Sequence, residues 1–210
     1  MTRQASLAAL ALLTILPLIA ETPAGWKMRL DKSTSATDPD ASGDIKFEKM
    51  GSGFHATNPA AAVFWNPANT IAGNYSIKGT FALMAPARHT EFYGLIFGGS
   101  ELEGSGQNYI YFMVAQDGTW LLKRREGDAS APTITAKTPH DAVVKPDASG
   151  KSKNALEVRV LADKIELFVN GAMVHTEPKA GLAAKTDGIY GIRINHHLEV
   201  HVDGFAVSKL

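Results

Sequence analysis

The stretch LEVRVLADKIELFVNG, residues 156–171, establishes the fold class of this chain. Apolar side chains occupy every second position over 156–160 and again over 165–169. This period of two is typical of strands that turn one face to a core and the other to water. Asn170-Gly171 follows at once and favours a type I′ hairpin, because both central residues of that turn need a positive φ. We therefore expect two antiparallel strands and a returning third strand over 173–176.

The same alternation extends outward from this stretch. It recurs over 75–83, whereas 91–97 and 108–115 are apolar at nearly every position, which is typical of inner strands covered on both faces. Turn residues recur about every 8 to 15 positions, and no helical period is sustained. The sequence therefore predicts an all-β fold, an antiparallel β-sandwich of roughly eleven to thirteen strands.

Two further features concern the connections and the last strand. The longer loops are expected over 33–43, 132–153 and 177–185, and the first and last of these have room for a short helical turn. In the last strand the apolar positions change parity at Asp203-Gly204. One extra residue turns the pleat over, so we expect a β-bulge there.

Composition excludes several classes of protein. The chain has 210 residues, with 21 basic and 21 acidic side chains, no cysteine and a formal net charge of zero. Charges of the two signs are interspersed, so the basic stripe that nucleic acid requires is missing, and we exclude nucleic acid as a partner. Without cysteine the fold has no disulfides, and the core alone must hold it together.

The first twenty residues differ from the rest. Arg3 is the only charged residue before Glu21, and an apolar run over 5–20 is interrupted by Pro17. A membrane anchor needs about 20 apolar residues, so this shorter run predicts a secretory signal peptide over 1–20. We expect residues 21–210 to form a single β-sandwich domain, periplasmic or secreted, with no membrane span in the mature protein.

Five short motifs carry a family resemblance: GLIFGG at 94–99, YIYF at 109–112, WLLKRR at 120–125, VNG at 169–171 and DGIYGIR at 187–193. Together they resemble the concanavalin A-like, or laminin-G-like, jelly roll over about residues 25–210. The similarity is to the bacterial branch of 3-keto-disaccharide hydrolase-like and laminarinase-like proteins. It implies a concave sheet on which members of the superfamily bind or cleave glycans.

The last strand holds the candidate catalytic residues. His197, Glu199, His201 and Asp203 alternate with apolar residues, so we expect them in a row on the outward face, about 6.5 Å between neighbours. Laminarinase-like proteins carry Glu-x-Asp-x-Glu on such a strand. Here both outer positions are histidine, so the carboxylate pair that retaining hydrolysis needs about 5.5 Å apart is missing. Glu199, His201 and Asp203 remain the catalytic candidates; zinc ligation and a plain solvated face are the alternatives.

Residues 38–44, with the sequence DPDASGD, are similar to the first seven positions of a calcium-binding loop. Asp38, Asp40 and Asp44 are therefore the candidate metal ligands. Lys49 occupies the position of the bidentate glutamate, and a plain surface loop is the competing interpretation. The sequence calls for no cofactor, and calcium is the ion that this loop suggests.

Glycan recognition combines aromatic rings with hydrogen-bonding side chains, because sugar rings show apolar C–H patches between their hydroxyl groups. Residues of both kinds occur near one another in several parts of the chain. The candidate ligand-binding residues are Trp65, Arg88, Tyr93, Trp120, Arg124, Asn195 and His197.

Three functions are compatible with these features. The first is a lectin-like module that binds a carbohydrate or cell-surface polymer on its concave sheet, without catalysis. The second is a glycoside-cleaving enzyme, a hydrolase or lyase, of the 3-keto-disaccharide hydrolase type. The third is a non-catalytic domain that binds another protein through its edge strands. The broken carboxylate motif favours the first.

Overall fold

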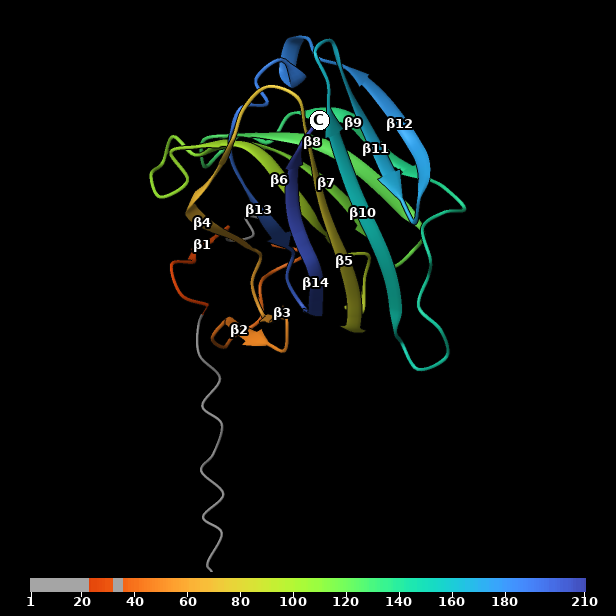
Figure 1. The fold of residues 1–210 in the computed structure, drawn as a ribbon. Helices are drawn as coiled ribbons and strands as arrows, with labels where there is room; N and C mark the ends of the chain where they lie inside the picture. Colours follow the sequence, from red (N-terminus) through yellow and green to blue (C-terminus); the bar gives the residue numbers. More distant parts are fainter. Residues whose placement is uncertain (1–22, 32–35) are drawn as a thin grey trace, which may run out of the picture.

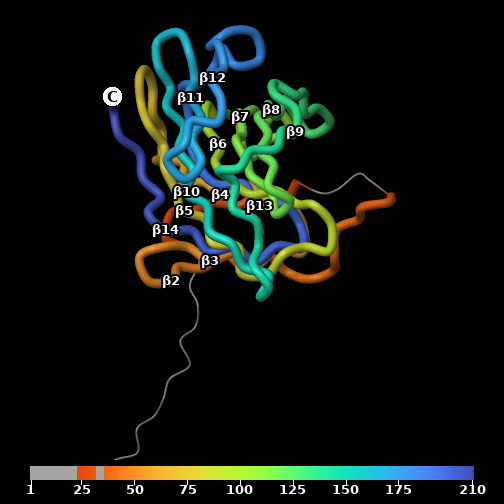
Figure 2. The backbone as a smooth tube through the Cα atoms, turned by 90° about the vertical axis from the view of Figure 1, so that its right-hand side faces the viewer, coloured from red at the N-terminus to blue at the C-terminus, as the bar shows by residue number. Residues whose placement is uncertain are grey.

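The computed structural model describes residues 23–31 and 36–210, and within them two seven-stranded antiparallel sheets stack as a β-sandwich (Figures 1 and 2). Sheet A has the order β1 (Lys27–Leu30), β4 (Ala62–Ile71), β13 (Gly188–Ile194), β6 (Phe92–Ser100), β7 (Asn108–Ala115), β8 (Thr119–Glu126), β9 (Thr133–Pro139). Sheet B has the order β12 (Ala172–Pro178), β11 (Lys164–Val169), β10 (Ser152–Val160), β5 (Tyr75–Ala85), β14 (Leu198–Lys209), β3 (Gly53–Asn58), β2 (Lys46–Met50). The predicted fold class, an all-β antiparallel sandwich, is confirmed.

The alternating stretch forms β10 and β11, as predicted. Leu156 pairs with Val169, and the two strands stay in register throughout. Asn170 and Gly171 have φ values of 51° and 83°, the positive values that a type I′ turn requires. The Asn170 side chain also accepts a hydrogen bond from the backbone N–H of Ala155 at 2.8 Å. The turn chemistry therefore sets the register of this hairpin.

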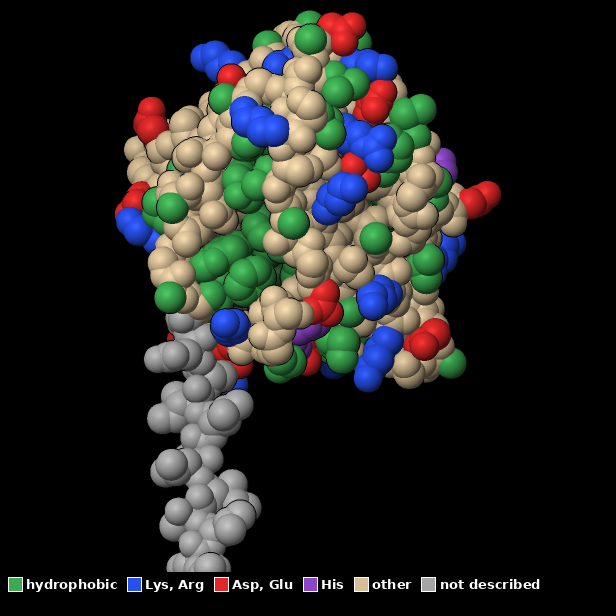
Figure 3. All heavy atoms as spheres, viewed as in Figure 1, with side chains coloured by type: hydrophobic (Ala, Val, Ile, Leu, Met, Phe, Trp, Pro, Cys, Tyr) green, Lys and Arg blue, Asp and Glu red, His purple; other side chains and the backbone are tan. Residues whose placement is uncertain are grey.

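The main core lies between the sheets and consists of the inward-facing residues of both. Phe81 and Val158 of sheet B and Leu95 and Phe112 of sheet A are fully buried there. Each such side chain stabilises the fold by about 1.5–3 kcal/mol through removal of apolar surface from water. On the side of β4 and β14, Figure 3 shows apolar side chains at the surface. Aromatic rings, including Phe205 of β14, close the core beside β14. Trp26 packs there on Phe54, with ring centroids 4.5 Å apart.

The central strands of sheet A are buried on both faces, as the sequence predicted. A second apolar cluster covers their outer side and includes Trp65, Ile96, Tyr109 and Met113. Gly94 of β6 lies so close to β7 that a Cβ atom there would come within 2.2 Å of a backbone oxygen. Only glycine fits this inner position.

The connections agree with the sequence in part. The register of β14 against β5 shifts between Asp203 and Ala206, which confirms the expected bulge. A short 3₁₀ helix, Gly181–Ala183, occupies the loop expected over 177–185. The loop expected over 132–153, however, contains β9, and the described residues form fourteen strands, more than expected. β9 is an edge strand without a buried face, so it lacks the alternation that marks the other strands.

The predicted signal peptide, residues 1–20, lies outside the described residues. Among the residues that the structure describes, no helix is both long enough and apolar enough to cross a membrane.

Candidate functional site

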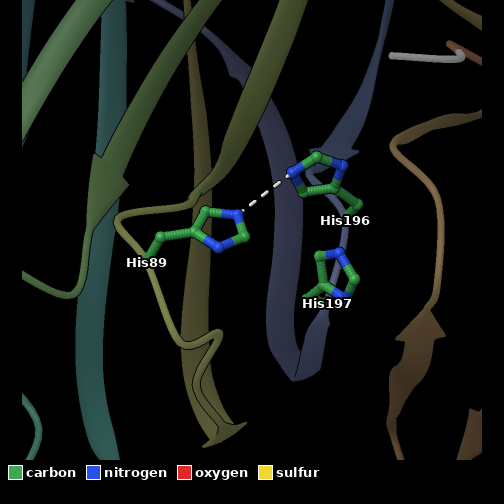
Figure 4. Close-up of side chains that lie close together, drawn as sticks. All are labelled: His89, His196 and His197. Carbon is green, nitrogen blue, oxygen red and sulfur yellow. Dashed lines mark hydrogen bonds between the residues drawn. The ribbon is translucent and has the colours of Figure 1, made fainter. Parts of the chain in front are cut away.

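Histidine and acidic side chains gather at the end of the sandwich where β13 leaves sheet A and β14 enters sheet B. His196 and His197 lie in this turn, and His89 lies in the segment that leads into β6 (Figure 4). His197 has a φ of 58°, in the left-handed region, which lets the chain reverse between the two sheets. Asp38 and Asp40 come from the segment that precedes β2.

Four side chains form a compact group, which we call the histidine cluster: Asp38, His89, Glu91 and His196. His89 Nε2 lies 2.9 Å from Asp38 Oδ1 and 3.1 Å from Glu91 Oε1. His196 Nε2 lies 2.8 Å from Glu91 Oε1 and 3.3 Å from Asp38 Oδ1. The two Nε2 atoms are 3.3 Å apart, so both rings point to one centre (Figure 4).

A surrounding layer of polar groups orients the histidine cluster. Asp40 Oδ1 lies 2.9 Å from His196 Nδ1, on the side of the ring that faces away from the centre. Asn195 donates a hydrogen bond of 2.7 Å from Nδ2 to Glu91 Oε2, which leaves Oε1 directed to the histidines. His197 Nε2 lies 3.2 Å from the carbonyl oxygen of Pro39 and ties this turn to the segment before β2.

Burial and charge differ across the cluster. The side chains of Glu91 and His196 are each 6% exposed, whereas those of Asp38 and His89 are 42% and 43% exposed. Burial alone lowers the pKa of His196, but the hydrogen bond to Asp40 and the negative charges of Glu91 and Asp38 outweigh it. The net pKa of His196 is raised. The cluster therefore has a buried base of negative potential and an open side that faces solvent.

The open side lines a hollow of about 560 Å³, which we call the end cavity. Such a volume lies within the range of about 300–1,000 Å³ typical of small-molecule sites. The end cavity combines two carboxylates, a guanidinium and two imidazoles with apolar proline and alanine surface. Its lining consists of Thr37, Asp38, Pro39, Asp40, Pro86, Ala87, Arg88, His89 and His197.

Five of the residues singled out in the sequence meet here: Asp38, Asp40, Arg88, Asn195 and His197. Sequence reasoning missed the inner members of the cluster, His89, Glu91 and His196. The signal that marks them is local: His89 and Glu91 stand two positions apart just before a strand, and His196 precedes a second histidine. Alternation at a strand end places such an i, i+2 pair on one side of the chain.

The other four ligand-binding candidates lie elsewhere. Tyr93 and Trp120 are 0% and 2% exposed in the main core, and Trp65 is 2% exposed in the apolar cluster outside sheet A. Arg124 points inward and donates a hydrogen bond of 2.9 Å to the carbonyl oxygen of Leu182, which anchors the 3₁₀ segment. These rings offer no open face to a sugar, so the expectation that they bind a ligand has no support in the structure. Aromatic side chains are often highly buried, so residue type alone does not mark a binding site.

The catalytic candidates lie on the outward face of β14, as predicted. Glu199, His201 and Asp203 line a second hollow of about 590 Å³, the sheet cavity, over a region where Figure 3 shows histidine and acidic side chains near β14 and β3. His201 Nε2 lies 3.3 Å from Asp203 Oδ1, and His55 of β3 lies 3.3 Å from Glu199 Oε1. The expected position of His197 in this row is wrong, because its left-handed backbone comes before β14 begins.

The expected calcium loop does not form as the sequence suggested. Asp38 and Asp40 reach the two ring nitrogens of His196, at 3.3 Å and 2.9 Å. Asp44 instead lines a separate hollow of about 360 Å³ beside Glu199. The three aspartates therefore do not converge on one point, because the chain between Asp40 and Asp44 passes from one hollow to the next.

No family model and no curated protein matches this chain. Among solved structures, the carbohydrate-binding module CBM66 from Bacillus subtilis superposes with a TM-score of 0.61 at 10% identity, over 88% of this chain and 96% of that one. A galectin-like protein of unknown function from Bacillus subtilis has a TM-score of 0.56 at 14% identity, over 88% and 89%. A putative glycosyl hydrolase from Parabacteroides distasonis has a TM-score of 0.55 at 12% identity, over 88% and 100%. The chain shares their jelly-roll β-sandwich fold, consistent with the concanavalin A-like resemblance.

Proposed function

We propose that this protein is a lectin-like carbohydrate-binding module that holds a glycan or cell-surface polymer in the end cavity. In this proposal residues 1–20 are a signal peptide, 21–210 a single domain, and the mature protein is periplasmic or secreted. The observation that carries the proposal is the convergence of Asp38, Arg88 and His89 on one open hollow. Carboxylates accept hydrogen bonds from sugar hydroxyls, and arginine donates to ring and hydroxyl oxygens.

The end of the sandwich is preferred over the outer face of sheet A as the glycan site. Tyr109, Trp65 and Tyr111 of that face are buried, with exposed fractions of 0%, 2% and 7%. A sugar needs an open ring face to stack on, so this face offers little surface for binding. The fold shared with a carbohydrate-binding module supports a binding role, and the charged lining of the end cavity supports its position.

A glycan array with residues 21–210, followed by calorimetric titration of the strongest soluble hit, tests the proposal. Arg88→Ala is expected to weaken binding at least about tenfold, because a charge-assisted hydrogen bond contributes about 1.5–3 kcal/mol. Lys153→Ala is the matched control, since Lys153 is an exposed cation outside the cavity lining. Absence of binding to any glycan at millimolar concentration ends the proposal.

A second candidate is a glycoside-cleaving enzyme of the 3-keto-disaccharide hydrolase type, and one observation favours it. Glu199 and Asp203 each lie 3.3 Å from a histidine along the sheet cavity, an arrangement suited to general acid–base catalysis. Product analysis on ordinary and 3-keto disaccharides separates this candidate from the first. If Glu199→Ala and His201→Ala both retain the turnover of the unaltered protein, the sheet cavity is not its active site.

A further inference from the structure

We propose that the histidine cluster binds a divalent transition-metal ion, and that zinc fits it best. The ligands are Nε2 of His89, Nε2 of His196, Oδ1 of Asp38 and Oε1 of Glu91. The inference rests on the geometry of these four side chains and does not depend on which glycan, if any, the end cavity holds.

The separations between ligand atoms match a tetrahedral ion. Zinc bonds to histidine nitrogen and carboxylate oxygen are about 2.0–2.1 Å, so the edges of a regular tetrahedron are about 3.3 Å. Five of the six edges of the histidine cluster are 2.8, 2.9, 3.1, 3.3 and 3.3 Å. All four atoms lie within 4.8 Å of one another, which includes the sixth edge, between the carboxylates of Asp38 and Glu91.

Hydrogen bonds alone do not account for these contacts. Each Nε2 carries at most one proton, and an ionised carboxylate carries none. Two protons at most are therefore available for five contacts of 3.3 Å or less, and the contact between His89 and His196 brings two nitrogens together. The carboxylate of Glu91 is buried and that of Asp38 is half exposed, and both are directed to the same two ring nitrogens, so a cation between them is favoured by both charges. A single ion at the centre satisfies all four atoms at once.

The polar layer around the cluster prepares the ligands for a metal. Asp40 accepts from Nδ1 of His196 at 2.9 Å, which fixes the tautomer that leaves the Nε2 lone pair free. Asn195 holds the second oxygen of Glu91 at 2.7 Å and so directs the first oxygen to the centre. A carboxylate behind a ligating histidine is the usual partner in zinc sites.

The ligand types distinguish zinc from calcium. Calcium takes six to eight oxygen ligands, whereas imidazole nitrogen suits zinc, copper, iron and nickel. Two imidazoles and two carboxylates in a tetrahedral arrangement therefore favour zinc over the calcium that the sequence of residues 38–44 suggested. The ion would also bind the segment before β2 to the turn between β13 and β14, because Asp38 and His196 come from these two elements.

The experiment uses residues 21–210 without a histidine tag, stripped with a chelator and then titrated with zinc chloride in a calorimeter. We expect one ion per chain with a Kd below about 1 μM. His89→Ala removes an exposed ligand and is expected to weaken binding more than about 100-fold, whereas His140→Ala, at a site outside the cluster, leaves the Kd unchanged. Cobalt in place of zinc is expected to show the strong visible absorption of a tetrahedral ion.

Asp40→Asn tests whether Asp40 orients His196 for metal binding, separately from any effect on the stability of the fold. We expect a Kd about 10- to 100-fold weaker, with the circular dichroism spectrum and the melting temperature of the metal-free protein unchanged. Two results overturn the proposal: no saturable binding of zinc, cobalt or nickel at micromolar concentration, or zinc binding that His89→Ala leaves intact. Because no glycan is present in these titrations, a failure of the glycan proposal leaves their outcome unaffected.

Discussion

Substitution of Asp31 by asparagine is expected to destabilise the protein strongly. Asp31 is 7% exposed and follows β1 at the outer face of sheet A. Its carboxylate forms ion pairs with both Arg125 and Arg193, whose side chains are 13% and 10% exposed. Arg193 also donates to the hydroxyl of Tyr109 at 2.8 Å. Two largely buried cations therefore share this one buried carboxylate, and the more exposed Asp128 adds a second negative charge near Arg125.

The loss of stability expected for Asp31→Asn follows from the guanidinium charges that it leaves without their buried carboxylate. Removing one partner of a buried ion pair costs about 3–5 kcal/mol, and asparagine recovers part of this by hydrogen bonding, so we expect about 2–3 kcal/mol. For a domain of this size 1 kcal/mol corresponds to about 2–4 °C in melting temperature, which gives a decrease of about 5–10 °C. Calorimetric melting and urea denaturation measure both quantities.

Asp128→Asn is the matched control for this substitution. Asp128 pairs with Arg29 on the same face of sheet A, but its side chain is 55% exposed, and exposed ion pairs contribute about 0–1 kcal/mol. If Asp31→Asn loses no more stability than Asp128→Asn, burial does not determine how much stability is lost when one partner of an ion pair is removed, and this prediction is refuted.

Three further substitutions test the fold. Asn170→Ala is expected to lose about 2 kcal/mol in urea denaturation, because alanine is strained at a φ of 51° and loses the side-chain hydrogen bonds of the turn. Glu157→Gln tests pH dependence: burial raises the pKa of Glu157, but hydrogen bonds from Arg159 and Ser76 outweigh it and the net pKa is lowered. The stability that the Glu157 carboxylate contributes is therefore present above its unfolded pKa of about 4.3 and is lost as the pH falls through its lower folded pKa. The free energies of unfolding of the wild type and of Glu157→Gln are therefore expected to converge in acid. Gly94→Ala is expected to abolish soluble expression, since its Cβ atom would overlap a backbone oxygen of β7, and a soluble, folded variant would contradict this packing.

The strands that bury one face could be predicted from the sequence, and the edge strand β9 could not. Over residues 156–160 and 165–169 burial alternates residue by residue, so the order of apolar side chains determines which face of each strand is buried. β9 buries little, and its sequence TITAKTP carries no such constraint. Aromatic type alone did not separate core from surface either, as the buried Tyr93 shows.

The candidate site could be predicted only in part, because its three segments are remote in the chain. Asp38, His89 and His196 come from loops that no local pattern brings together, and only the sandwich places them at one end. His197 shows a second limit. The alternating pattern placed His197 in the outward row of β14, but its positive φ turns the side chain to the end cavity. A histidine in the sequence does not predict this backbone conformation.

An NMR titration of ¹⁵N-labelled residues 21–210 with an oligosaccharide that binds the protein locates the binding site without any substitution. The proposed function predicts that the amide shifts concentrate in 37–40, 86–89 and 195–197, the segments around the end cavity. Saturable binding whose shifts map instead to the outward face of β14, or to β7 and β8 in sheet A, would contradict the assignment of glycan binding to this end of the sandwich.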